Sequence, residues 1–167
     1  MKLFGLGAFI AALACCSVNA GEVNVGLNGG YASASDMTQN DLYNAQLYTQ
    51  YNFDGGLGIE GGYNVFSGGE VADKDVTTHG PYVAASLNAD LGRNLDLYSR
   101  AGVMYAMQAG DVDSHQRFSP FLGLGAKFAL TDNFYGKAGY DHYFELNNSN
   151  EVDTDADVFY AGLGFNF

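Results

Sequence analysis

The strongest constraint on this chain is an alternation of apolar and polar residues with a period of two, which recurs along most of its length. Successive side chains of a β-strand point to opposite faces, so the alternation predicts strands with one apolar and one polar face. The predicted strands cover residues 22–32, 42–53, 57–66, 80–91, 95–107, 118–130, 134–144 and 160–167.

The connections between these segments alternate in length. Short turns follow the second, fourth and sixth segments, at residues 54–56, 92–94 and 131–133, and are rich in residues that tolerate tight turns. Longer polar stretches follow the other segments, at residues 33–41, 67–79, 108–117 and 145–157. This rhythm predicts an all-β fold of eight antiparallel strands that run up and down, with both ends of the chain on the side of the short turns.

The composition of the two faces indicates which of them meets lipid. The hydrophobic fraction is 47%, yet after residue 20 no segment resembles a membrane-spanning helix. Aromatic residues of the apolar face fall into two bands, as in a barrel whose outer surface crosses a bilayer. The band near the long connections contains Tyr31, Tyr43, Tyr105, Phe144 and Phe159. The band near the short turns contains Tyr51, Phe53, Phe134, Phe165 and Phe167. The polar faces are too poor in charge for a water-exposed surface and suit an enclosed lumen, which predicts a transmembrane β-barrel.

The last residues carry a recognisable spacing. Gly162, Phe165 and Phe167 follow the pattern x-x-Gly-x-x-aromatic-x-aromatic. The pattern resembles the C-terminal sorting signal of bacterial outer-membrane β-barrels, which the barrel-assembly machinery reads. The resemblance therefore implies an assembly signal at these three residues and the assembly machinery as a partner.

The first residues are typical of a secretory signal peptide. Lys2 precedes an apolar run, and Val18-Asn19-Ala20 is a small-x-small cleavage site. We expect cleavage after Ala20, which leaves residues 21–167 as one barrel domain. Both cysteines, Cys15 and Cys16, precede that site. The mature chain would then have neither a disulfide nor a thiolate metal site, and we expect no metal and no cofactor.

Motifs in the second half extend the resemblance. They are the stretch from Pro120 to Phe128 with the turn at residues 131–133, and the following stretch from Tyr135 to Tyr143. The chain resembles the small OmpA-like and OmpX-like eight-stranded outer-membrane β-barrels over essentially the whole mature sequence. This implies a monomer in the outer membrane of a Gram-negative bacterium, with surface contacts such as adhesion or serum resistance. It lacks the peptidoglycan-binding domain of full-length OmpA, so a cell-wall tether is not implied.

Few charges occupy the polar faces of the predicted strands. An eight-stranded barrel has an interior only wide enough for side chains to fill, and buried charges must pair. We therefore predict a network that joins the cations Arg100, Lys127 and Lys137 to the carboxylates Glu60 and Asp141. Two interpretations remain, a gated path for solutes or protons and a plug that closes and orients the barrel; we favour the plug.

The long connections hold most of the negative charge, and the chain has a formal net charge of −12. Their acids are Asp36, Asp41, Glu70, Asp73, Asp75, Asp111, Asp113, Glu145, Glu151, Asp153, Asp155 and Asp157. Such a rim repels nucleic acid and other anionic surfaces, and carboxylates of this kind can take up divalent cations that bridge lipopolysaccharide phosphates. Residues 153–157 resemble the start of an EF-hand loop but lack its later glycine and glutamate, so no specific calcium site is expected.

Three functions stay open. The first is an envelope-structural or surface-contact role, with outer-membrane lipid, lipopolysaccharide and a possible host-surface or phage ligand as partners. The second is a narrow pore for small solutes. The third is a lipid A-modifying enzyme, which would need a histidine held near a serine or aspartate at the outer rim. His142 is the candidate, but its neighbours Asp141 and Tyr143 point to the other face. We therefore expect no enzymatic activity.

Overall fold

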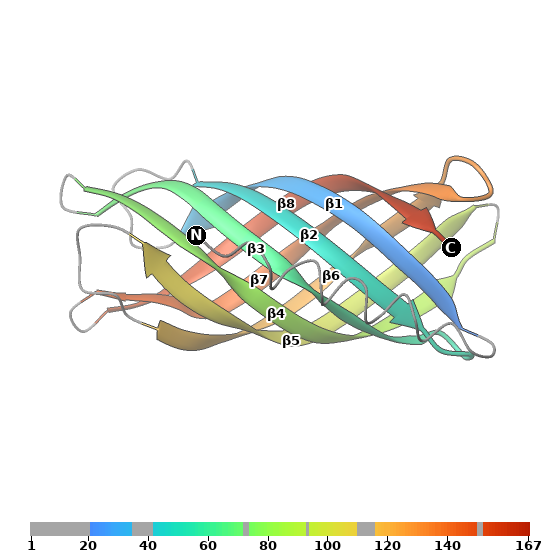
Figure 1. Cartoon of the computed structure of the whole chain (residues 1–167), viewed down its shortest axis with the longest axis horizontal. Coiled ribbons are helices and arrows are strands. Elements are labelled where there is room, and N and C mark those ends of the chain that lie inside the picture. Colours follow the sequence, from blue (N-terminus) through green and yellow to red (C-terminus); the bar gives the residue numbers. More distant parts are fainter. Residues whose placement is uncertain (1–20, 35–41, 72–73, 93, 110–115, 150–151) are drawn as a thin grey trace, which may run out of the picture.

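The computed structural model describes residues 21–34, 42–71, 74–92, 94–109, 116–149 and 152–167. These residues form eight strands in a closed barrel in which every neighbouring pair is antiparallel (Figure 1). The strands are β1 (Glu22–Ala34), β2 (Leu42–Asn52), β3 (Leu57–Val71), β4 (Lys74–Asp90), β5 (Leu95–Ala109), β6 (Gln116–Ala129), β7 (Phe134–Ser149) and β8 (Val152–Asn166). The predicted eight-stranded up-and-down barrel is confirmed.

The first and last strands close the barrel. β1 pairs with β8 from Asn24↔Asn166 to Ala34↔Ala156, so no strand edge is left unpaired between them. The start of β1, the end of β8 and the three short turns lie together at the right in Figure 1. We call this the turn end, and the opposite end the loop end. Gly55 and Gly56 have positive φ angles of 89° and 84°, which explains the glycine pair in the β2–β3 turn.

The strands extend further toward the loop end than the alternation predicted. β3 runs to Val71 and β4 starts at Lys74, so much of the stretch 67–79 is strand rather than loop. In the same way, β7 and β8 take up most of residues 145–157. Register shifts interrupt both hairpins, between Phe66 and Gly69 and between Tyr143 and Asn147. The irregularity adds one residue to β3 and two residues to β7 where these strands leave their regular ladders, and it interrupts the uniform alternation from which the strand ends were predicted.

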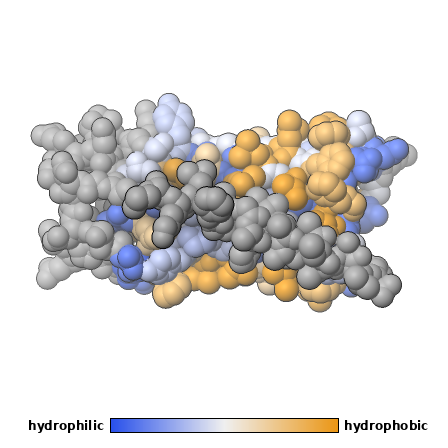
Figure 2. Space-filling model, viewed as in Figure 1, coloured by the Kyte–Doolittle hydropathy of each residue, from blue (hydrophilic) through white to orange (hydrophobic). Residues whose placement is uncertain are grey.

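The outward face is apolar and the inward face is polar, which is the reverse of a water-soluble barrel. Exposed large apolar side chains come from every strand or adjoining turn; they include Leu27, Tyr43, Ile59, Val83, Leu97, Leu122, Leu124, Phe159 and Leu163. On the face drawn in Figure 2, apolar side chains gather in a belt on the side of the turn end. Within the described ranges, no helix is long and apolar enough to cross a membrane.

Two sets of residues from the sequence analysis are not covered by this description. The predicted signal peptide, residues 1–20, lies outside the described residues. Most acids of the long connections have side chains outside the described part as well; Glu145, Asp155 and Asp157 are the ones within it.

Candidate functional site

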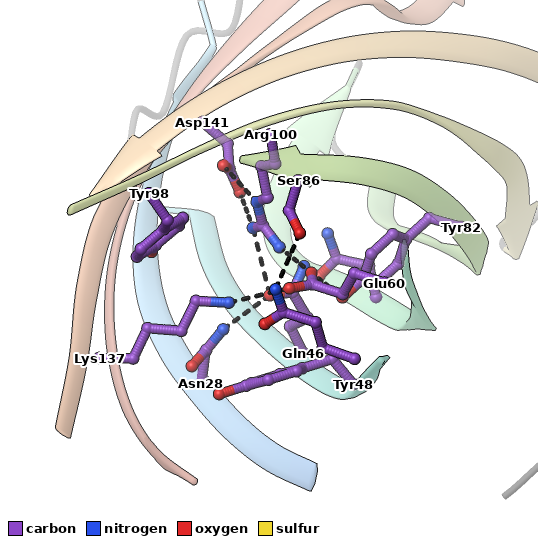
Figure 3. A network of polar contacts seen from close by, with 12 residues as sticks. Asn28, Gln46, Tyr48, Glu60, Tyr82, Ser86, Tyr98, Arg100, Lys137 and Asp141 are labelled. Atoms are coloured by element: carbon purple, nitrogen blue, oxygen red, sulfur yellow. Dashed lines mark hydrogen bonds and ion pairs between the residues drawn. The ribbon is translucent and has the colours of Figure 1, made fainter. Parts of the chain in front are cut away.

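Arg100 of β5 stands at the centre of the lumen. Its Nη1 donates to a carboxylate oxygen of Glu60 on β3, and its Nη2 donates to Oδ2 of Asp141 on β7. Nε also donates to Oδ1 of Asp141 at 3.0 Å, which makes a two-pronged contact. Figure 3 shows how these side chains converge from separate strands. The guanidinium group thus ties three alternate strands together across the barrel.

A second cation completes this group. Nζ of Lys137 lies 3.0 Å from Oε2 of Glu60, and the Tyr82 hydroxyl donates to Oε1 of the same carboxylate at 2.8 Å. The ionised side chains are at most 2% exposed. We call Glu60, Arg100, Lys137 and Asp141 the lumen charge cluster. It holds two cations and two carboxylates, so its formal charges cancel, as burial in a narrow lumen requires.

Lys127 does not join this cluster. Its Nζ donates to Oε1 of Gln50 at 2.8 Å, and Gln50 in turn donates to the Ser86 hydroxyl at 2.8 Å. Lys127 and Lys137 are direct partners across β6 and β7, so their ammonium groups would repel each other if both turned to Glu60. Lys137 takes the carboxylate, and Lys127 lines a cavity at the turn end instead. The predicted network thus has four of its five members in contact with one another.

Aromatic rings fill the lumen on the loop side of this cluster. The Phe121 and Tyr143 rings stack at 4.9 Å between centroids, and the edge of Phe66 meets Tyr143 at 5.4 Å. All three side chains are at most 2% exposed. Tyr143 was predicted to face the lumen, whereas Phe66 and Phe121 were not named, although the alternation along β3 and β6 places both on the inward face. Together the three rings form an apolar plug above the charges.

Inward-facing glycines make room for the large lumen side chains. The hydroxyls of Tyr98 and Tyr160 meet at 2.6 Å, and those of Tyr48 and Tyr135 at 2.9 Å. A Cβ added at Gly125 or Gly139 would collide with the Tyr98 hydroxyl. The inward-facing glycines therefore reflect tight packing in the middle of the lumen, around these tyrosines.

The three residues of the predicted assembly signal divide between the two faces. Gly162 faces the lumen, where an added Cβ would collide with the backbone oxygen of Leu27. Phe165 lies on the outer face, and its ring contacts Phe134 at 4.9 Å and Phe167 at 4.8 Å between centroids. The spacing of the motif thus follows from packing on both sides of β8; its role in assembly stays a prediction.

His142 lies on the outer face near the loop end, where it meets an acid that the sequence analysis did not pair with it. Its Nδ1 is 2.7 Å from Oδ1 of Asp157, its cross-strand partner on β8. The Tyr140 hydroxyl donates to the same oxygen at 2.5 Å. Sequence reasoning looked only at the adjacent residues of His142, whereas the partner comes from the register of β7 and β8. No serine, threonine or cysteine of the described ranges is hydrogen-bonded to His142, and those ranges hold no group of three metal-ligating side chains arranged around a common point.

Comparison with known proteins identifies the family. The model of the outer membrane protein β-barrel domain matches residues 3–167. The chain belongs to this family. It is therefore an integral protein of the outer membrane of a Gram-negative bacterium. No protein in the curated set matches its sequence.

Solved structures with the same barrel are distant in sequence. Neisserial surface protein A is 17% identical, with a TM-score of 0.73 over 87% of this chain and 97% of that one. Ail, the attachment invasion locus protein of Yersinia pestis, is 19% identical, with a TM-score of 0.60 over 89% and 100%. A de novo designed transmembrane β-barrel is 17% identical, with a TM-score of 0.60 over 90% and 98%. Because a designed barrel matches as well as Ail does, the likeness concerns the fold.

Proposed function

We propose that this protein is an envelope-structural or surface-contact protein that works through the loop end of its barrel and carries nothing through its lumen. The observation that carries this proposal is the combination of a filled lumen with strands that project past the apolar belt. The filled lumen argues against transport. The projecting strands provide a surface outside the cell that other molecules can contact.

The argument against a pore rests on two successive obstacles. A solute would first have to part the lumen charge cluster, in which Arg100 holds two carboxylates on different strands. It would then meet the plug of Phe66, Phe121 and Tyr143. Breaking a buried ion pair costs several kcal/mol, which makes spontaneous opening rare. The cluster thus acts as a closure and a brace rather than as a gate.

The described loop end presents a surface suited to contact. Polar residues there include the half-buried, hydrogen-bonded pair of Tyr63 and His79, whose Oη and Nδ1 are 2.6 Å apart, and the ion pair of Arg117 and Glu145. Partly exposed rings that carry polar groups are frequent in contact surfaces because they bury much area while keeping a hydrogen bond. We propose that the chain acts as a monomer, reaches the membrane through the barrel-assembly machinery and meets lipopolysaccharide and an external ligand at this end.

The negative net charge of the chain restricts the kinds of ligand that the loop end is expected to bind. Ail has been solved in complex with the heparin analogue sucrose octasulfate, which is a dense polyanion. With a formal charge of −12, the present chain would repel such a ligand unless cations bridged the two. We therefore propose a neutral or cationic surface partner, or lipopolysaccharide phosphates joined through divalent cations. Catalysis is not part of this proposal, because within the described part of the chain no serine, threonine or cysteine is hydrogen-bonded to the pair of His142 and Asp157.

One experiment separates the contact function from the pore. The chain from Gly21 onward is refolded and inserted into planar bilayers, and the same barrel is displayed on cells that are offered host-cell surfaces. We expect no steady conductance but cell binding that falls at least several-fold when residues 110–115 are replaced by a Gly-Ser linker. Steady ohmic conductance without loss of binding in the loop variant would replace this proposal by the pore.

A further inference from the structure

The turn end of the lumen opens into a cavity of about 340 Å³. Residues of the β2–β3 turn and of seven strands line it, with Lys127 and Tyr135 among them. The short turns of outer-membrane barrels face the periplasm, so the cavity is reached from that side. We call it the periplasmic vestibule. It is separate from the loop end, and the surface-contact role makes no use of it.

Unpartnered polar atoms collect in this vestibule. Of the four buried side-chain polar atoms without a hydrogen-bond partner in the described residues, three belong to residues that line it: Asn24 Nδ2, Asn88 Oδ1 and Asn166 Oδ1. Asn24 is 2% exposed. The orientation of Asn88 is set by its Nδ2, which donates to the backbone oxygen of Gly56 at 3.2 Å, so its Oδ1 is left as an acceptor. These three atoms have almost no solvent-accessible surface, so they lie in the wall of the cavity rather than facing it. Because buried polar groups without partners are costly, their side chains would gain by turning toward an occupant that supplies both acceptors and donors.

The charges of the vestibule differ in burial, although Asp96 and Lys127 are cross-strand partners on β5 and β6. Lys127 is 7% exposed and lies at the inner part, where Gln50 takes one of the three hydrogen bonds that an ammonium group donates. The rim carboxylates, Glu22, Asp90 and Asp96, are more exposed. Among the described lining residues, the inner part is thus cationic and the rim anionic.

This arrangement selects among classes of ligand. A simple anion would have to pass three rim carboxylates to reach Lys127. A simple cation would be attracted to the rim but repelled at the inner part. A molecule that carries a carboxylate and an ammonium group a few bonds apart satisfies both parts at once.

We propose that the periplasmic vestibule binds a small zwitterion of the α-amino acid type. Its carboxylate accepts hydrogen bonds from Lys127 and Asn24, and its ammonium group faces the rim carboxylates and the free acceptors of Asn88 and Asn166. The Tyr48–Tyr135 hydroxyl pair and the lumen charge cluster lie further in. The site is therefore a blind pocket, and binding involves no passage across the membrane.

The test uses the chain from Gly21 onward, refolded in nanodiscs, with glycine as the probe. Acetate and methylamine, at equal ionic strength, each carry one half of its charge pattern. Binding is followed by side-chain amide and backbone NMR shifts of the lining residues. We expect saturable shifts with glycine and at least tenfold weaker binding of either analogue. No saturable shift, or equal binding of acetate or methylamine, would overturn the proposal, with water or a simple ion as the occupant.

Variants assign the binding to the vestibule. Lys127→Met should weaken glycine binding at least tenfold, whereas Arg117→Met at the opposite end should leave it unchanged. Unchanged binding in Lys127→Met contradicts the proposal. If that variant does not refold, Glu22→Gln with Asp90→Asn, both at exposed positions, should weaken glycine binding several-fold without weakening that of acetate; equal loss for both probes also contradicts it. Planar-bilayer conductance and cell binding stay independent readouts of the proposed contact function.

Discussion

The lumen charge cluster and the rim pair of Arg117 with Glu145 join the same chemical groups in opposite environments. In the lumen, Arg100 and its two carboxylates are at most 2% exposed. At the rim, the Arg117 side chain is 32% exposed and that of Glu145 48%. Water and salt weaken the attraction between the two groups at the rim, and water solvates either charged group when its partner is removed. In the lumen no solvent is available to do so.

The contrast teaches what each region can tolerate. Removing one member of a buried pair leaves a charge without compensation, so the lumen constrains its residues as a group. Removing one member of the rim pair leaves a solvated charge, so the rim can change one residue at a time. A barrel that keeps its lumen constant and varies its rim is suited to contact with changing external partners, in line with the proposed function.

The largest effect is expected from Arg100→Met. The variant leaves Glu60 with Lys137 but Asp141 without its guanidinium partner, and it should lower the free energy of unfolding by about 3–5 kcal/mol. Urea unfolding of the refolded barrel in detergent, followed by the mobility of unheated samples on gels, measures the change. A loss below about 1 kcal/mol, the size expected for an exposed pair, would remove the difference between the two regions.

A double variant serves as the control. Arg100→Met with Asp141→Asn removes one cation and one anion and keeps the pair of Glu60 and Lys137. Because no formal charge is left uncompensated, it should recover a large part of the lost stability. If the double variant is less stable than Arg100→Met alone, the cost comes from lost packing of the guanidinium, which contacts the Phe121 ring at 5.5 Å, rather than from charge.

The same contrast explains what the sequence could predict. The period of two assigns Glu60, Arg100, Lys137 and Asp141 to the lumen, because a single strand contains that information. Which charges meet depends on how the strands are staggered around the barrel, a property of all eight strands together. The stagger also explains why Lys127 is hydrogen-bonded to Gln50 rather than to one of the carboxylates predicted for it.

The outer face shows the same limit of prediction from a single strand. The alternation places His142 on that face, yet its partner Asp157 comes from the neighbouring strand and is invisible without the register. The ends of the strands were also misjudged, since the irregularity near Phe66 adds one residue to β3 and that near Tyr143 adds two residues to β7. Local periodicity thus predicts faces well and pairings poorly.

A lumen substitution that leaves the charge unchanged tests whether packing alone makes stability sensitive to mutation in this region. Gly162→Ala places a methyl group against the backbone of Leu27. We expect a loss of about 1–3 kcal/mol in the same unfolding assay, the usual cost of overpacking. Gly29→Ala is the matched control, because an added Cβ there has no atom within 4 Å, and it should be close to neutral.

The assay also separates packing from assembly, because refolding in detergent involves no assembly machinery. If Gly162→Ala is as stable as the unchanged barrel in detergent but fails to reach the membrane in cells, Gly162 is needed for recognition and not for packing. Loss of stability in detergent would show that the glycine of the signal is required by the lumen itself.

A smaller effect is expected when a neutral hydrogen bond in the lumen is removed. Tyr160→Phe deletes one hydroxyl of the pair with Tyr98, which are 2.6 Å apart, and should cost about 1 kcal/mol. Burial is the same as in the lumen charge cluster, but no net charge is exposed by the change. If Tyr160→Phe costs as much as Arg100→Met, burial rather than ionisation accounts for the sensitivity of the lumen. Tyr43→Phe, at an exposed position of the outer face, is the matched change.

The smallest effect is expected at the rim. Arg117→Met should change the free energy of unfolding by about 0–1 kcal/mol, and the difference from the unchanged barrel should shrink further as salt is raised, because exposed charges are screened. Unfolding at low and high salt measures both quantities. A loss near 3 kcal/mol that salt does not reduce would mean that the rim is braced as strongly as the lumen. The loop end would then be a rigid extension of the barrel, and its contact surface would have to be selected as a unit rather than residue by residue.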